Sequence, residues 1–295
     1  IYLKPLSIFP ELHSDTLFGA ITYAISQLYP EKVDEMVKSF EDEPPFIISS
    51  TFPFIFKEDF ENIDEIIAKA QSNNVGKYIN NATDSKSITE VIELCDKYEN
   101  MYAAVGFHPE FADKITENDF DYLRKCLTNK KVIAMGEIGL DYHYTKDNKT
   151  QQIELFEKQL AIAQEYNLPV IVHNREATLD IINCLKKYNV KGVIHCFNGS
   201  LETANIFIKM GFKLGINGVI TFKNCKLKEV IKQLPLSEFV LETDCPYLAP
   251  EPLRGTKNDP SNIIFIAKFV AEIYKISLLQ VENITNANIR QIFDI

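Results

Sequence analysis

Four residues of types that bind metal ions stand where predicted strands end. They are Glu137 in "GEIGLDYH", His173 in "VIVHNR", His195 in "VIHCFNG" and Asp244 in "LETDCPY". Each of them, taken alone, is equally well explained as a core residue with satisfied hydrogen bonds or as a helix cap. A buried carboxylate or imidazole, however, carries a desolvation cost unless it is paired or binds a cation. One divalent ion would satisfy all four, and ligation by carboxylates and imidazoles suits Zn²⁺, Mn²⁺ or a similar ion.

Strand periodicity sorts the neighbours of these four candidates. Cys196 and Cys245 each directly follow a candidate ligand, so we expect both thiols to face the helices and to pack there as small hydrophobes. Glu242 is expected to face the same side as Asp244, one layer deeper, and to support it. Asp141 is either a further hydrogen-bond acceptor or a turn residue, and the sequence favours neither.

The elements that must position these residues alternate regularly from Phe46 onward. Eight β-rich runs are each followed by an amphipathic helical pattern, which predicts an α/β fold of the (β/α)₈ TIM-barrel type. In such a barrel the C-terminal ends of the strands share one face, where active sites lie. An open doubly wound sheet is the alternative, disfavoured because no Gly-x-Gly-x-x-Gly turn is present. The predicted strands cover residues 46–52, 76–82, 101–107, 132–139, 168–174, 192–197, 212–218 and 239–244.

Residues 1–45 do not follow this alternation. Pro44 and Pro45 mark a boundary after them. We therefore predict a mostly helical extension, too short to fold as an independent domain, followed by a barrel domain over residues 46–295. The patterns within the extension predict a strand and two helices, over residues 1–7, 14–30 and 31–43.

Composition and charge limit the classes of function. The 295 residues are 46% hydrophobic and 24% charged, with a net charge of −10, which argues against broad binding to a polyanion but leaves room for a metal-lined pocket that grips one phosphate. No apolar run approaches the roughly 20 residues that span a membrane, and the first residues lack the pattern of a signal peptide. The six cysteines form no Cys-x-x-Cys pair, so a reducing cytoplasm is the simplest location.

Several long motifs carry a family resemblance that runs from about Lys57 to the closing stretch "NITNANIRQIF". In chain order they are "VGFHPE", "MGEIGLDYHY", "LPVIVHNREA", "GVIHCFNGSLETA", "GVITFKN" and "LETDCPYLAPEPLRGTKNDP". This part of the chain resembles the TatD family of metal-dependent deoxyribonucleases, within the amidohydrolase-like barrels. The resemblance implies hydrolysis of phosphodiester bonds, typically in DNA, with divalent ions such as Mg²⁺, Mn²⁺ or Zn²⁺.

The resemblance also implies roles for individual residues. Glu137 would bridge two metal ions, with His173 and His195 completing one metal position. Asp244 would bind the other ion and help to activate water, so that Asp244 and Glu137 are the catalytic candidates.

Three further residues would line the substrate side of the site. By resemblance, His108, Arg175 and Arg254 would bind substrate and contact phosphate. For Arg254 the alternative is an ordinary solvated loop residue.

The chain departs from the family pattern at the end of the first strand. That strand should end in Asp-Thr-His-x-His, with both histidines on one metal ion, but the corresponding positions read Ser50-Thr51-Phe52-Pro53-Phe54. A phenyl ring has no lone pair to donate. One metal position is therefore expected to keep only Glu137 and Asp244 and to be impaired, while the other stays intact.

The residues before this departure resemble a different protein. "LHSDTLFG" and "PPFIISSTFPF" give residues 1–56 a likeness to the RAMP-type subunit that caps the guide RNA's 5′ end in type III CRISPR effectors. The two sequences would then join inside the first barrel strand, and the two phenylalanines would come from the RAMP-like part.

Three hypotheses about function follow. The first is a weakened TatD-type phosphodiesterase with DNA as substrate, and the second is a catalytically inactive barrel that binds one ion or none. The third, a CRISPR component that binds guide RNA, is disfavoured because a ferredoxin-like RNA binder needs a four-stranded sheet and this fragment supplies one strand.

Overall fold

The computed structural model describes residues 47–53, 62–143 and 147–295, and for residues 47–53 it describes the backbone alone. The strand and helices predicted within residues 1–45 lie outside this part of the chain. The N-terminal extension and its boundary with the barrel domain therefore stay predictions.

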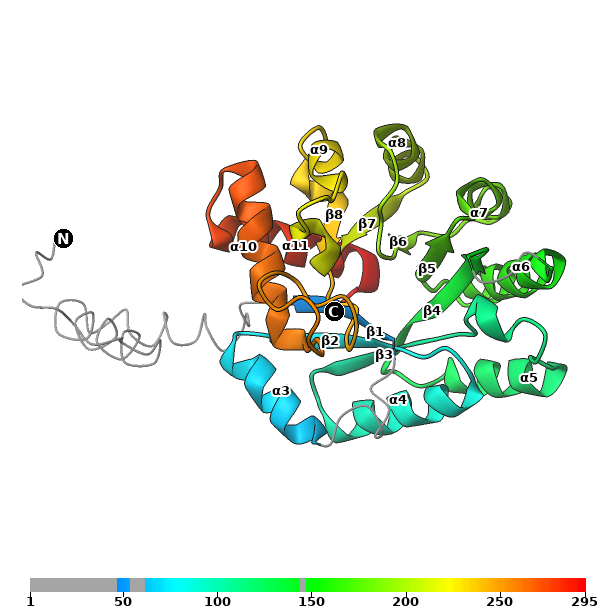
Figure 1. Cartoon of the computed structure of the whole chain (residues 1–295). Helices are drawn as coiled ribbons and strands as arrows, with labels where there is room; N and C mark the ends of the chain where they lie inside the picture. Colours follow the sequence, from blue (N-terminus) through cyan, green and yellow to red (C-terminus); the bar gives the residue numbers. More distant parts are fainter. Residues whose placement is uncertain (1–46, 54–61, 144–146) are drawn as a thin grey trace, which may run out of the picture. The chain divides into compact units, whose positions relative to one another are not determined.

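Eight parallel strands form one sheet, in the order in which they occur along the chain. The sheet is curled so that the last strand, β8, contacts the first, β1, and the helices lie around its outside (Figure 1). The predicted TIM-barrel fold is confirmed, and all eight predicted strands are present. Their bounds are β1 Ile47–Pro53, β2 Lys77–Asn81, β3 Met101–Val105, β4 Val132–Asp141, β5 Val170–Arg175, β6 Gly192–Ile194, β7 Phe212–Ile216 and β8 Phe239–Leu241.

Strand β1 ends at Pro53, a residue that has no N–H to donate to a sheet. Its last two residues pair in parallel register with β2, Phe52 with Asn80 and Pro53 with Asn81. The side chain of Phe52 and the whole of Phe54 lie outside the described residues. From their spacing of two residues, we expect both rings to project into the mouth of the barrel.

Helices connect successive strands, and local capping defines where several of them begin. At the start of α4, Asp84 accepts a hydrogen bond from the backbone N–H of Ser87, whose hydroxyl accepts one from the N–H of Asp84. Within the described residues, no helix has the length and apolar character needed to cross a membrane. The helices are α3 Ile63–Ser72, α4 Ser85–Lys97, α5 Glu117–Cys126, α6 Lys149–Glu165, α7 Thr178–Leu185, α8 Leu201–Lys209, α9 Leu227–Ile231, α10 Ile263–Tyr274 and α11 Leu278–Phe293.

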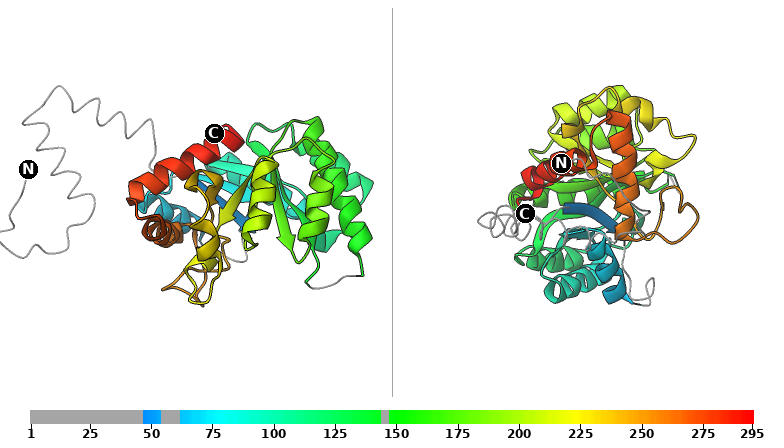
Figure 2. Two further views of the ribbon diagram at one scale, coloured as in Figure 1. Left: turned by 90° about the horizontal axis from the view of Figure 1, so that it is seen from above. Right: turned by 90° about the vertical axis from the view of Figure 1, so that its left-hand side faces the viewer.

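A small hydrophobic plug fills the barrel interior at the N-terminal ends of the strands. Helix α11, the closing helix, lies at this end (Figure 2) and contributes Ile289, Ile292 and Phe293 to the plug. A larger cluster packs between the outer faces of the strands and the surrounding helices. The strand residues of the plug include Ile79, Ala104, Ala134, Ile171, Val193 and Val240.

The plug determines where polar side chains enter the barrel. Successive side chains on a strand alternate between faces, so the residue two positions after a plug residue faces the interior one layer nearer the C-terminal end. His173 follows Ile171 in this way, and His195 follows Val193. The candidate ligands therefore lie above an apolar floor, at the end of the barrel where β/α-barrel active sites occur.

The burial of Glu282 on α11 can be tested through the pH dependence of stability. Its side chain is 7% exposed, and burial raises its pKa to about 7. The raised pKa means that the folded chain holds a proton that the unfolded chain loses above pH 4.5, so stability falls as pH rises from about 4.5 to 7. Glu282→Gln should therefore stabilise the protein by about 1–2 kcal/mol at pH 8, allowing for solvent screening, and change little at pH 4.5.

Urea unfolding at the two pH values measures this effect. Glu272→Gln, an exposed position on α10, is the matched control and should leave the unfolding midpoint unchanged at both. An equal gain from both substitutions would contradict the assignment to burial of Glu282.

Candidate functional site

A cavity of about 560 Å³ opens at the C-terminal ends of the strands, and all four sequence-predicted ligands line it. Glu137 comes from β4 and His173 from β5, while His195 and Asp244 follow the ends of β6 and β8. The structure thus brings together side chains that lie more than 100 residues apart in sequence. Their service as metal ligands stays a prediction.

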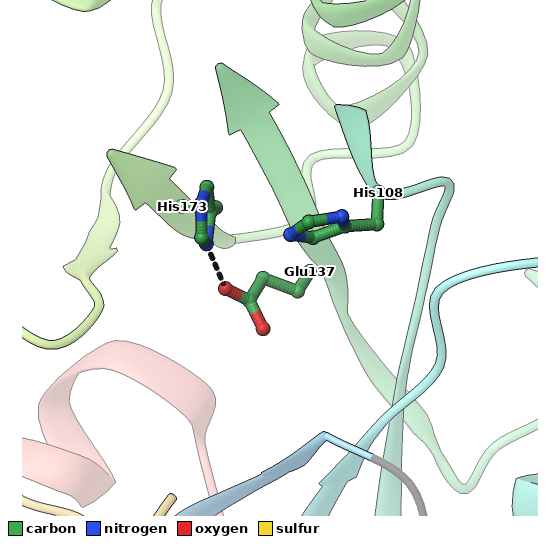
Figure 3. A group of neighbouring side chains, drawn as sticks. All are labelled: His108, Glu137 and His173. Atoms are coloured by element: carbon green, nitrogen blue, oxygen red, sulfur yellow. Dashed lines mark hydrogen bonds and ion pairs between the residues drawn. The ribbon is translucent and has the colours of Figure 1, made fainter. Parts of the chain in front are cut away.

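Glu137, His173 and Asp141 form a chain of hydrogen bonds across the cavity. The imidazole of His173 lies between two carboxylates, with Nδ1 2.7 Å from Glu137 Oε1 and Nε2 3.0 Å from Asp141 Oδ2 (Figure 3 shows the first contact). Asp141 serves in both of the ways left open, because its Oδ2 orients His173 while its Oδ1 accepts the backbone N–H of His143 in the turn.

His195 lies in a second chain of the same kind. Its Nδ1 is 2.9 Å from Glu242 Oε2, and its Nε2 is 3.0 Å from Asp244 Oδ1 and 3.8 Å from Glu137 Oε1. Glu242 is fully buried and also accepts the backbone N–H of Cys196. The prediction that Glu242 supports the site from a deeper layer therefore agrees with its contacts.

Gly215 on β7 makes room for the Glu242 carboxylate. A Cβ at this position would lie 2.5 Å from Glu242 Oε2, closer than real side-chain contacts permit. Any larger residue would push Glu242 away from His195.

His108 is the third imidazole at the cavity, and it lies beside Glu137 and His173. One ligand atom from each of His108, Glu137 and His173 lies within 4.8 Å of the others (Figure 3). The rings of His108 and His173 pack edge to face, with centroids 4.5 Å apart. By resemblance His108 was expected on the substrate side, and the structure places it within reach of a shared metal ion.

The ionised forms of Glu137, His173 and His195 are strongly favoured. Burial alone would raise the pKa of Glu137 and lower the pKa values of the two histidines. The attraction between the carboxylate and the imidazolium groups shifts each pKa the opposite way and is the larger effect. The three surrounding imidazoles hold the pKa of Glu137 well below its usual range. Hydrogen bonds with Asp141 and Glu137 raise the pKa of His173 to about 9, and the charges of the nearby carboxylates raise that of His195 well above its usual value.

His108 shifts in the opposite direction. Burial and the positive charge of His173 lower the pKa of His108 to about 3. Its ring is therefore neutral at neutral pH, and its Nδ1 accepts a hydrogen bond from the backbone N–H of Glu110 at 3.4 Å.

Two features of the cavity fit a divalent ion. Protons on His173 and His195 balance the negative charge of the carboxylates in the cavity. A metal ion would displace those protons and supply the same positive charge. In addition, Thr83 is among the residues that line the cavity, and its buried Oγ1 has no hydrogen-bond partner among the described residues. The residues that would hold an ion are His108, Glu137, His173, His195 and Asp244.

Two glutamines on α6, which the sequence analysis missed, brace the backbone of the site. Gln152 exchanges two hydrogen bonds with the backbone of Asp141, and Gln159 does the same with Phe107, which precedes His108. Both amides are buried. Their spacing of seven places them on one face of the helix, a signal that could have identified them.

The two arginines predicted to bind phosphate occupy different places. Arg175, at the end of β5, lines the cavity. Arg254 lies in the exposed loop after β8, where its guanidinium stacks 4.3 Å over the ring of Phe222. Both assignments stay predictions.

Cys196 does not face the helices as strand alternation predicted, whereas Cys245 is buried as expected. Strand β6 ends at Ile194, and the positive φ of 47° at Cys196 turns the chain, so that its side chain lines the cavity and its sulfur accepts a hydrogen bond from the Asn217 amide. The expectation for Cys196 was wrong because the alternation stops where the strand ends.

Comparison with known proteins agrees with this geometry. A family model described as TatD related DNase matches residues 54–294. The uncharacterized metal-dependent hydrolase YabD of Bacillus subtilis is 40% identical over 238 residues, which cover 79% of this chain and 93% of YabD. YcfH of Escherichia coli K12, also an uncharacterized metal-dependent hydrolase, is 33% identical over 239 residues, which cover 80% of this chain and 89% of YcfH.

Solved structures share the fold. The crystal structure of the TatD homologue YjjV from Escherichia coli K12 has a TM-score of 0.77 and 31% identity, covering 85% of this chain and 99% of that one. A mutant organophosphorus hydrolase from Deinococcus radiodurans, at 11% identity and a TM-score of 0.55, covers 78% of this chain and 82% of its own, and is similar in fold alone.

Proposed function

The chain belongs to the TatD family of metal-dependent hydrolases, and on this premise we propose that it hydrolyses phosphodiester bonds in DNA, as a deoxyribonuclease acting on single-stranded or short substrates. The observation that carries the proposal is the convergence of Glu137, His173, His195 and Asp244 in one cavity with a cationic side chain, Arg175. Carboxylates and imidazoles supply the metal ligands, and a guanidinium suits the phosphate.

The residues of the site would divide the work of hydrolysis. A bound Mg²⁺, Mn²⁺ or Zn²⁺ ion would neutralise charge on the phosphate and lower the pKa of water. Asp244, oriented by its hydrogen bond with His195, would accept the proton of the attacking water. Arg175 would orient the phosphate, and Asp141 and Glu242 would keep the two imidazoles in place.

We further propose that one of two metal positions is impaired. The intact position would use Glu137, His173 and His195, and the impaired one would keep Glu137 and Asp244 without the first-strand histidines. The family match begins at residue 54, so it includes Phe54 and leaves Phe52 and Pro53 before it.

A different function, guide-RNA binding in a CRISPR effector, rests on the resemblance of residues 1–56 alone. The family match to residues 54–294 gives it no support. The partner that we propose is DNA, and we propose no association with a membrane. All six cysteines are free, which supports a reducing compartment such as the cytoplasm.

Metal content tests the proposed impairment. We expect about one tightly held divalent ion per chain after dialysis, because three protein ligands hold an ion well and two hold it poorly. Elemental analysis of the dialysed protein, beside a nuclease assay with added Mn²⁺ on short single-stranded DNA, measures both properties.

Each outcome separates the alternatives. Two stoichiometric ions after dialysis would refute the impairment. One ion without hydrolysis of any phosphodiester would favour the inactive barrel over the nuclease.

A further inference from the structure

An exposed apolar ledge, made by Tyr247 and Leu248, borders the metal-ligand cavity. Tyr247 is 60% exposed and Leu248 is 36% exposed, and both line the cavity. Of the large hydrophobic side chains that are exposed in the described part of the chain, these two are sequence neighbours and the others stand singly. Single exposed hydrophobic residues are ordinary, and these two stand out because both line the cavity.

Buried hydrogen bonds hold the backbone beneath the exposed Tyr247 ring. The amide of Asn258, which is fully buried, donates to the carbonyl oxygens of Thr243 at 2.5 Å and of Tyr247 at 2.7 Å. The backbone N–H of Asn258 donates to Pro246 O at 2.9 Å, and that of Tyr247 donates to Asp244 O at 2.8 Å. The ring is thus exposed on a fixed support, anchored next to Asp244.

Leu248 adopts a strained conformation that its surroundings enforce. Its φ of 51° lies in the left-handed region, which residues other than glycine rarely adopt. Its carbonyl oxygen lies so close to Gly218 that a Cβ there would be 2.1 Å away, which leaves the 3₁₀ segment Gly218–Thr221 packed against the ledge. Strain of this kind persists where a structure over-determines it, and such places cluster at ligand clamps.

Two guanidinium groups in this part of the fold suit a phosphate, beside a cavity that also carries four carboxylates. Arg175 lines the same cavity, and Arg254 lies in the loop that carries Tyr247, held over Phe222 directly after Gly218–Thr221. The occupant therefore needs a phosphate for the cavity and a flat apolar face beside it. A nucleotide in a single strand has both, since its base is free to stack on an aromatic ring.

We infer that Tyr247 stacks on the nucleobase next to the scissile phosphate, with Leu248 extending the contact, so that the ledge positions single-stranded DNA in the cavity. The inference rests on the proposed function and assigns a specificity residue to that same site. Stacking of a base on an aromatic side chain is worth about 1–3 kcal/mol, or roughly 5- to 150-fold in affinity.

The test compares two probes with identical phosphates, a fluorescently labelled oligothymidylate and the same backbone with every base replaced by an abasic residue. Binding is measured by anisotropy with Ca²⁺, and cleavage with Mn²⁺. We expect the unmodified protein to prefer the thymidylate strand. Tyr247→Ala should weaken thymidylate binding about tenfold and leave abasic binding unchanged, and Tyr247→Phe, which keeps the ring face, should bind as the parent does.

The abasic strand and a second tyrosine serve as controls. Unchanged abasic binding shows that Tyr247→Ala still folds, and Tyr166→Ala, at an exposed tyrosine directly after α6, should leave both affinities unchanged. The inference would be overturned if the parent bound the two strands equally, or if Tyr247→Ala lost the same affinity for both. Cleavage of both strands would in that case still support the proposed function. Loss with Tyr247→Phe would also overturn stacking. If the parent neither binds nor cleaves either strand, the proposed function itself fails and the inference fails with it.

Discussion

Replacing Glu137 with glutamine is expected to abolish tight metal binding and to lower DNA hydrolysis by about 10³-fold, or about 4 kcal/mol of barrier. Glu137 is 3% exposed and lies between His173 at 2.7 Å and His195 at 3.8 Å. Its carboxylate is the group shared by the two halves of the site, and the amide of glutamine has no negative charge to hold a cation. Elemental analysis and single-turnover cleavage of a short single strand measure the two losses.

The matched control for this substitution is Glu165→Gln, which makes the same change in a surface ion pair. Glu165 lies 2.7 Å from Arg124 at the end of α6, where such a pair contributes at most about 1 kcal/mol. Metal content and hydrolysis should both stay at the parental level. If Glu137→Gln also retained its ion and its activity, the assignment of the metal centre would be wrong.

Restoring the missing histidines is expected to raise nuclease activity by at least about tenfold, which corresponds to ~1.4 kcal/mol of barrier. The change is Phe52→His with Phe54→His, at the two positions where the family pattern has its histidines. Two imidazoles beside Glu137 and Asp244 would rebuild the second metal position, and the dialysed double mutant should then hold about two ions. Ser50→Asp is added where orientation of the new ligands requires an acidic partner.

A double mutant without ligands separates metal binding from relief of crowding. Phe52→Ala with Phe54→Ala removes both rings and adds no donor, so it should hold one ion and show no comparable gain. Single-turnover assays with saturating Mg²⁺ or Mn²⁺ compare the three proteins. A fully active parent, or a histidine mutant that binds two ions and gains nothing, would refute the proposed role of the phenylalanines.

The barrel was predictable because its strands are short apolar runs bounded by helical patterns. Parallel strands buried on both faces require such runs, and they recur eight times from Phe46 onward. The convergence of His173, His195 and Asp244 was predictable for the same reason, since the C-terminal ends of parallel strands in a barrel share one face. The pattern "KLKEVIKQL" over residues 226–234 predicts a longer helix than α9, which covers Leu227–Ile231.

The position of Glu137 shows where alternation fails as a guide. In a regular strand, Gly136, two positions after the plug residue Ala134, would face the barrel interior, and Glu137 would face the helices. The pairing of β4 with β5 shifts register between Met135 and Ile138, and Glu137 lies at this irregularity with its carboxylate in the cavity. Such a shift re-aims a side chain and has no signature in residue type alone.

By itself, therefore, the sequence determined the order of elements, the end of the barrel that carries chemistry and the types of residue that gather there. The tertiary structure alone decided which atoms meet: Asp141 with the far nitrogen of His173, His108 beside Glu137, and Cys196 in the cavity. The physical reason is that periodicity constrains side chains only within one regular element. Contacts made at strand ends and across loops depend on the curl of the sheet and on single backbone angles, such as the positive φ at Cys196, and these are set by packing between residues far apart in the chain.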